Sequence, residues 1–160
     1  MIQNVRTYAV QHQLQIAERL GCGVHGIVFV AENKFKTGKT ALKSHHAPEP
    51  YFRERGVYER LRDVGVSEIL GFRVPQLLQA DGQLRVIEMS IVTRPFVLDF
   101  AGAYLDRPPD FPEEQWTEWK TEKREQFDER WPMVQRVLEA LEGLDIYMVD
   151  VSPGNIAFPD

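Results

Sequence analysis

Three glycines followed by a β-branched run constrain this chain more than any other feature of its sequence. Gly21, Gly23 and Gly26 have the spacing G-x-G-x-x-G, which occurs both in dinucleotide-binding turns and in loops that cover phosphates. In a dinucleotide-binding turn a helix follows the third glycine, whereas residues 27–31 here read Ile-Val-Phe-Val-Ala and predict a strand. The sequence therefore predicts a hairpin of strand, glycine turn and strand.

A third strand is predicted at residues 40–44, after a polar connection at residues 32–39. This strand would bring Lys43 beside the glycine turn. Backbone N–H groups at glycines, together with one ammonium group, suit the phosphate oxygens of a nucleotide. The alternative that these residues leave open is an ordinary glycine-containing hairpin with a surface lysine.

The hairpin and the strand after it resemble the glycine-rich loop and the lysine strand of the protein kinase superfamily. The residues on which this resemblance depends are Gly21, Gly23, Gly26, Val28, Ala41 and Lys43. The resemblance implies that these residues bind ATP or a related nucleotide.

Residues 50–64 predict a helix, on which Glu54 and Tyr58 share the inward face. In the kinase resemblance Glu54 is the helix glutamate that pairs with the strand lysine. A fixed carboxylate would keep that flexible lysine extended and protonated. Glu59 is the alternative partner, because spacing alone chooses between the two.

Two adjacent histidines, His45 and His46, stand between the lysine strand and this helix. A metal site would need further cysteine or histidine ligands, and the neighbouring sequence contains none. We therefore expect both histidines to be solvated loop residues.

Two more strands are predicted at residues 73–80 and 84–92, joined by an Asp-Gly turn. Together with a first hairpin strand at residues 13–20, they complete a five-stranded antiparallel sheet with one helix. Residues 5–10 allow a further short strand, whose role stays open.

The last strand of that sheet resembles the strand that leads into a kinase hinge. The resemblance implies that the backbone groups of Glu88 and Met89 contact the adenine of the nucleotide.

A change of lobe is predicted where prolines begin to interrupt the chain. We divide the chain into a kinase-like small lobe at residues 1–92 and a reduced, mainly helical lobe at residues 93–160, which ends with a segment similar to the catalytic loop. Helices are predicted at residues 112–130 and 131–143. Tryptophans with the spacing seen in the first of these helices are typical of core residues rather than of a binding cage.

The segment 146–156 reads Ile-Tyr-Met-Val-Asp-Val-Ser-Pro-Gly-Asn-Ile and resembles the kinase catalytic loop. Its Asp-x-x-Pro-Gly-Asn form is most similar to the small-molecule and atypical kinases. The resemblance implies that Asp150 orients an attacking hydroxyl or accepts its proton, and that Asn155 holds Mg²⁺.

The sequence departs from the kinase pattern around this loop. Met148 and Val149 stand where the family has His-Arg, and no Asp-Phe-Gly follows Asn155 before the sequence ends at Asp160. We therefore expect an incomplete Mg²⁺ site.

These patterns together predict a kinase-like α+β fold and a degenerate kinase-like protein that binds ATP with weak or no phosphoryl transfer. One alternative is an active small-molecule or serine/threonine kinase whose metal site is completed by a protein partner or a second copy of the chain. The other is a non-catalytic structural or interaction domain.

Composition limits the range of partners. The 160 residues are 43% hydrophobic and 27% charged, which is enough for one core. A net charge of -5 argues against a surface for nucleic acid or anionic membranes. Cys22 is the single cysteine, so no internal disulfide forms, and no apolar run of spanning length is present. We expect a cytoplasmic protein with a nucleotide as its partner.

Overall fold

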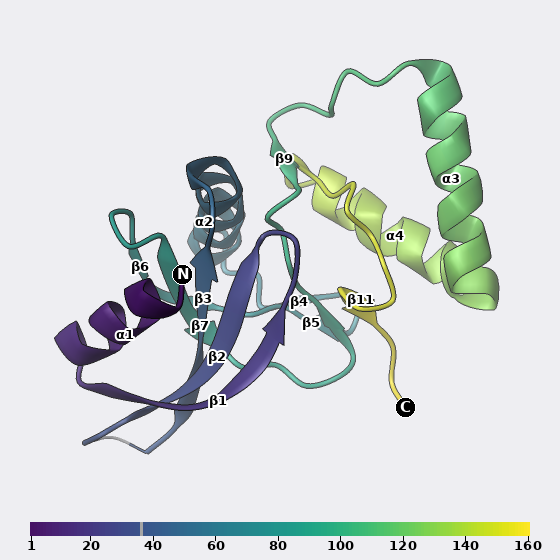
Figure 1. The fold of residues 1–160 in the computed structure, drawn as a ribbon. Coiled ribbons are helices and arrows are strands. Elements are labelled where there is room, and N and C mark those ends of the chain that lie inside the picture. Colours follow the sequence, from purple (N-terminus) through teal and green to yellow (C-terminus); the bar gives the residue numbers. More distant parts are fainter. Residues whose placement is uncertain (36) are drawn as a thin grey trace.

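The computed structural model describes residues 1–35 and 37–160, which form a mixed α+β fold (Figure 1). Its main sheet has five antiparallel strands in the order β1-β2-β3-β7-β6. The predicted five-stranded antiparallel sheet is thus confirmed. Its strands are β1 (Leu14–Cys22), β2 (Gly26–Asn33), β3 (Lys39–His45), β6 (Leu77–Asp81) and β7 (Val86–Ser90).

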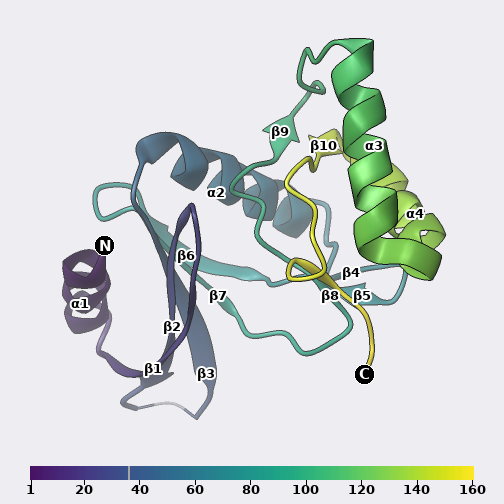
Figure 2. The same cartoon turned by 45° about the vertical axis from the view of Figure 1, so that its right-hand side comes forward.

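Helices cover both faces of this sheet, α1 (Ile2–Gln11) on one face and α2 (Pro48–Asp63) on the other (Figure 2). Successive side chains of a strand point to opposite faces. Accordingly, Leu42 belongs to the hydrophobic cluster under α1, whereas Ala41 belongs to the cluster that includes α2. Lys43 lies two residues beyond Ala41 on β3 and therefore also points to the α2 face.

The N-terminal segment is a helix, so the short strand predicted at residues 5–10 is wrong. Val5, Tyr8 and Ala9 are buried at helical spacing, and their packing against the sheet decides the conformation. The Tyr8 hydroxyl donates a hydrogen bond to Glu88 Oε2 at 2.9 Å inside this contact. Burial and the nearby Glu88 carboxylate raise the pKa of the Tyr8 hydroxyl.

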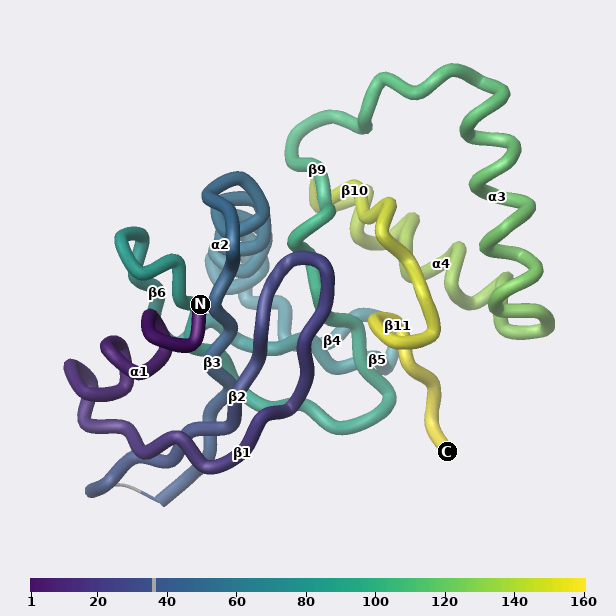
Figure 3. Tube along the Cα trace, viewed as in Figure 1, coloured from purple at the N-terminus to yellow at the C-terminus, as the bar shows by residue number. Residues whose placement is uncertain are grey.

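The two helices predicted in the second half of the chain are confirmed. They are α3 (Glu113–Phe127) and α4 (Trp131–Glu142), joined by the 3₁₀ turn η1 (Asp128–Arg130). They meet at this turn and diverge away from it (Figures 1 and 3). Among the helices of the described ranges, none is long and apolar enough to cross a membrane.

In the described ranges, six short strands form two further small sheets, which join segments that lie far apart in the sequence. β8 (Phe96–Val97) pairs antiparallel with β11 (Ile156–Ala157), and β9 (Tyr104–Leu105) pairs antiparallel with β10 (Ile146–Tyr147). These pairs place the segment between β8 and β9 beside the segment between β10 and β11. On its other side β8 pairs in parallel with β5 (Phe72–Arg73), which pairs with β4 (Glu68–Ile69).

One large hydrophobic cluster includes residues from both predicted lobes. Tyr51, Tyr58 and Ile87 belong to it, as do Val134 and Ile146. The boundary predicted between residues 92 and 93 is therefore crossed by a shared core, and the division into two lobes stays a prediction.

Candidate functional site

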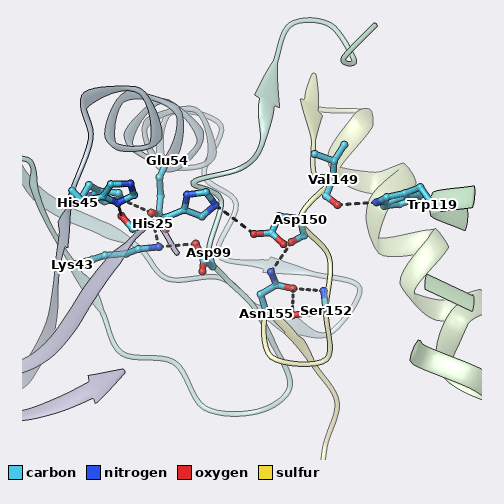
Figure 4. Close-up of polar contacts among 11 residues, drawn as sticks. His25, Lys43, His45, Glu54, Asp99, Trp119, Val149, Asp150, Ser152 and Asn155 are labelled. Atoms are coloured by element: carbon cyan, nitrogen blue, oxygen red, sulfur yellow. Dashed lines mark hydrogen bonds and ion pairs between the residues drawn. The ribbon is translucent and has the colours of Figure 1, made fainter. Parts of the chain in front are cut away.

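Lys43 and Glu54 form a buried ion pair on the α2 face of the sheet (Figure 4). Lys43 Nζ lies 2.7 Å from Glu54 Oε2, and the two residues are 5% and 1% exposed. Glu54 points inward because it shares the buried face of α2 with Val57 and Tyr58. Glu59, the alternative partner, pairs instead with Arg55 near the surface.

His45 also contacts this ion pair, which corrects the expectation that it is a solvated loop residue. It is fully buried, and its Nε2 lies 2.6 Å from Glu54 Oε2. The reason is that β3 extends to His45, and residues two apart on a strand share one face. His46 is exposed as expected, and its Nδ1 lies 3.0 Å from the backbone oxygen of His25.

The buried ion pair holds both partners in their charged forms. Burial by itself raises the pKa of the Glu54 carboxyl, but the contacts with Lys43 and His45 outweigh burial and lower the pKa to about 2. Burial lowers the pKa of the Lys43 ammonium, and the carboxylates of Glu54 and Asp99 outweigh it, so that pKa is raised. Lys43 is therefore a fixed positive charge.

Asp99 is the site residue that sequence reasoning missed. Its Oδ1 lies 2.7 Å from Lys43 Nζ, and its side chain is 34% exposed. It follows β8 in the order Asp99-Phe100-Ala101, and its backbone has a left-handed φ of 65°. The next residue, Phe100, is fully buried, and its ring meets the Tyr58 ring edge-on with 5.5 Å between the ring centroids.

The sequence does contain a signal for this residue, the pair Asp-Phe after an apolar strand. The kinase resemblance implies an Asp-Phe-Gly segment after the loop of Asn155, so Asp99, which precedes that loop, does not fit the pattern in chain order. The pairing of β8 with β11 brings the two segments together in space.

The loop of Asp150 is held together by Asn155. The Asn155 amide donates to the backbone oxygen of Asp150 at 2.6 Å and accepts from the Ser152 backbone N–H at 2.7 Å. The Asp150 side chain is 52% exposed, and its Oδ2 lies 3.5 Å from Nε2 of His25 on the glycine turn (Figure 4). The turn between β1 and β2 therefore reaches across to the loop of Asp150.

A cleft of about 450 Å³ lies between the sheet, the glycine turn and the segment of Asp99. Of the residues predicted to form the site, eight line it: Gly21, Gly23, Gly26, Val28, Ala41, Lys43, Glu54 and Met89. His25, Asp99 and Gly154 also line it, whereas Glu88, Asp150 and Asn155 do not.

The predicted hinge contacts need a correction. β7 lies between β3 and β6, so the backbone groups of Glu88 and Met89 belong to the two strand ladders and are not free for a ligand. The Glu88 side chain points away, to Tyr8. Ile91 and Val92, which directly follow Ser90 at the end of β7, line the cleft just beyond the sheet.

The three glycines of the turn have different structural roles. A Cβ on Gly26 would lie 2.3 Å from the backbone oxygen of Ser44, so the pairing of β2 with β3 itself requires this glycine. A Cβ on Gly21 or Gly23 would meet nothing within 4 Å, and neither residue has a left-handed φ. The fold therefore does not require glycine at these two positions.

The fit of the site to Mg²⁺ is mixed. Within residues 1–35 and 37–160, no group of three or more His, Cys, Asp or Glu side chains is arranged to hold a metal ion. Asn155 does not fit the predicted ligand role in this arrangement, because both ends of its amide hold the loop. Asp99 fits better, since its carboxylate is partly exposed and lines the cleft.

No protein-family model matches the chain, and no curated protein matches it at a significant level.

Proposed function

We propose that this chain is a kinase-like protein that binds a nucleotide of the ATP type in the cleft between the sheet and the Asp99 segment. The observation on which this proposal depends is Lys43, a lysine fixed by the buried Glu54 and directed into a cleft beneath a glycine turn. A buried ion pair is expensive to build and adds little to stability compared with apolar packing. Its position at the bottom of a cleft favours a role in ligand binding.

The lining of the cleft suits the parts of a nucleotide. Val28, Ala41 and Met89 offer apolar surface for a planar base, and Ile91 and Val92 line the cleft just beyond the end of β7. Gly21 and Gly23 are glycines that the fold does not require, which supports a role in the close approach of phosphates.

The charges in and beside the cleft favour a nucleotide that arrives with a divalent cation. Lys43 is the fixed positive charge, whereas Glu54, Asp99 and Asp150 bring three carboxylates to the same region. A polyphosphate alone would be repelled by this excess of negative charge. Asp99 is the residue that would hold Mg²⁺ against the phosphates, where the ion would neutralise their charge.

The resemblance to kinases is more complete when the segments are compared by their positions in the structure and not by their order in the sequence. Asp99-Phe100-Ala101 follows one short strand, and the Asp150 loop precedes the strand that pairs with it. In the kinase family the Asp-Phe-Gly segment comes after the catalytic loop, and here the corresponding residues come before it. This arrangement would supply the carboxylate that the sequence order lacked.

Phosphoryl transfer is the second candidate function, favoured by the placement of Asp99 beside Lys43. In such a reaction the bond between the terminal phosphorus and the bridging oxygen breaks, and a bond forms to the acceptor oxygen. The nucleoside diphosphate leaves, and the acceptor hydroxyl proton goes to Asp150. Lys43 and the glycine turn would hold the phosphates, and Asp150 would orient the hydroxyl.

The binding proposal is tested by titration calorimetry with ATP and Mg²⁺, using two matched glycine substitutions. Gly23→Ala adds a methyl group to the cleft, whereas Gly82→Ala adds one at a turn outside it, where the nearest atom is 3.9 Å away. We expect Gly23→Ala to weaken ATP binding about tenfold and Gly82→Ala to leave it unchanged. Absence of binding to the wild type at millimolar ATP, or equal effects of the two substitutions, would contradict the proposal.

A second arm tests Asp99 without measuring activity. Mg²⁺ should tighten ATP binding to the wild type, and Asp99→Asn should remove most of that gain. An affinity in the wild type that does not depend on Mg²⁺ would exclude Asp99 from this role and leave the binding proposal standing.

A further inference from the structure

A second cavity, of about 560 Å³, lies between α3, α4 and the strand that leads to Asp150. It is separate from the cleft under the glycine turn, and no residue lines both. The volume lies in the range of about 300 to 1,000 Å³ that is typical of small-molecule sites. We call it the tryptophan pocket, because Trp116, Trp119 and Trp131 all line it.

The three tryptophan rings form angled walls. Trp116 and Trp119 are 5.7 Å apart with an angle of 86° between their planes, and Trp119 and Trp131 are 6.2 Å apart at 69°. In each of these two pairs the edge of one ring meets the face of the other, and all three rings line the pocket. A cation is attracted to the negative face of an indole ring, so walls of this kind suit an organic cation.

The charged residues of the pocket point to the same ligand. Glu113, Glu139 and Glu142 line it with a single opposing charge, Lys120. All three glutamates are exposed, and none of them forms an ion pair within the part of the chain that the structure describes. The pocket thus combines an excess of two negative charges with aromatic walls.

Trp119 links the pocket to the catalytic-loop-like segment. Its Nε1–H donates to the backbone oxygen of Val149 at 2.9 Å, and Val149 directly precedes Asp150 (Figure 4). Tyr147, Met148 and Val149 line the pocket. This hydrogen bond fixes the Trp119 ring, which lowers the entropic cost of using it as a binding surface.

We propose that the tryptophan pocket binds a small organic cation, of which a quaternary ammonium group is the simplest form. The excess of negative charge disfavours an anionic ligand, and the indole walls favour a methylated ammonium over an inorganic cation, which retains its water shell. The proposal does not depend on nucleotide binding.

Intrinsic fluorescence measures this binding directly, because the chain has three tryptophans and all of them line the pocket. The probe is tetramethylammonium chloride, titrated into the full chain without nucleotide. Neopentyl alcohol is the neutral probe of similar branched shape, and sodium chloride controls for ionic strength. We expect saturable quenching by tetramethylammonium, with no saturable signal from the other two.

Two substitutions and one matched control locate the site. Glu139→Gln removes a carboxylate from the pocket, and Glu125→Gln makes the same change on an exposed face of α3 outside it. Trp116→Leu removes a half-buried ring and leaves the buried Trp131 in place. We expect about fivefold weaker binding or more for the two pocket variants and no change for the control.

Three results would overturn the proposal. They are the absence of saturable quenching by tetramethylammonium, equal binding of neopentyl alcohol, and equal binding by Glu139→Gln and Glu125→Gln. Circular dichroism of each variant separates loss of binding from loss of the fold. If Trp116→Leu fails to fold, the two glutamate variants still decide the outcome.

Discussion

The two sides of the cleft are built in different ways. On the sheet side Lys43 and Glu54 are almost fully buried, and each is fixed by strand or helix packing. On the loop side Asp99 lines the cleft with a partly exposed carboxylate, and Asp150 lies just outside the cleft and is half-exposed, in a loop whose backbone Asn155 fixes. The comparison shows that the sheet side holds its charges in a fixed, buried position, while the carboxylate of Asp150 on the loop side stays accessible to solvent.

The largest expected loss of stability comes from a substitution on the sheet side of the cleft. Glu54→Ala leaves the Lys43 ammonium and His45 without their buried partner, which should reduce the free energy of unfolding by about 3 to 5 kcal/mol. Glu59→Ala on the same helix removes only a surface pair and should cost about 0.5 kcal/mol. Urea unfolding of both variants measures the difference. Equal losses would show that the ion pair of Glu54 has no special role in stability.

The pH dependence of stability comes next in size. The pKa of Glu54 is about 2 in the folded chain against an ordinary value of 4.5, so its contribution is complete above pH 4.5. As the pH falls from 4.5 toward 2, roughly 3 kcal/mol should be lost. The stability difference between wild type and Glu54→Gln should therefore shrink on acidification. A difference that stays constant from pH 7 to pH 3 would contradict this assignment.

The glycine turn connects the two sides and gives an intermediate effect. Gly26→Ala places a methyl group against the backbone of β3 and should cost about 1 to 3 kcal/mol. Gly23→Ala enters open space and should change stability by less than about 0.5 kcal/mol. Thermal unfolding of the two variants compares them. A large loss of stability in Gly23→Ala would mean that the fold itself requires this glycine.

The smallest expected energy is the coupling between His25 and Asp150 on the loop side. The 3.5 Å contact between His25 and Asp150 is partly exposed, so a double-mutant cycle of His25→Ala and Asp150→Asn should give a coupling below about 0.5 kcal/mol. Each variant alone should stay folded with near wild-type stability. A coupling above 1 kcal/mol would mean that the loop side is fixed as firmly as the sheet side.

Local sequence patterns predicted the sheet side because its geometry is local. The strand predicted at residues 40–44 brought Lys43 beside the glycine turn, and helical periodicity placed Glu54 on the inward face. The same reasoning failed for α1 and for His45. In both cases packing against the rest of the chain decides the structure, and no short pattern contains that information.

The loop side was only half predictable. The Asp150 segment stood out as a motif, but Asp99 meets it through strand pairs between distant segments. The ligand contacts predicted for the backbone of Glu88 and Met89 failed for a similar reason, because one strand does not reveal its two neighbours in a sheet. For Asp99, the order of the motifs along the chain was misleading. For Glu88 and Met89, the sequence did not show that a second strand pairs with β7.

The central claim, that a nucleotide bridges the two sides of the cleft, is tested most directly by backbone amide NMR during a titration with ATP and Mg²⁺. We predict saturable shift changes on both sides, in residues 20–26, at Ile91 and Val92, and in residues 98–102, with a common affinity. The indole signals of Trp116 and Trp119 should stay unchanged, because their pocket is a separate one. No shift changes at millimolar ATP, or changes confined to residues outside the cleft, would contradict the account.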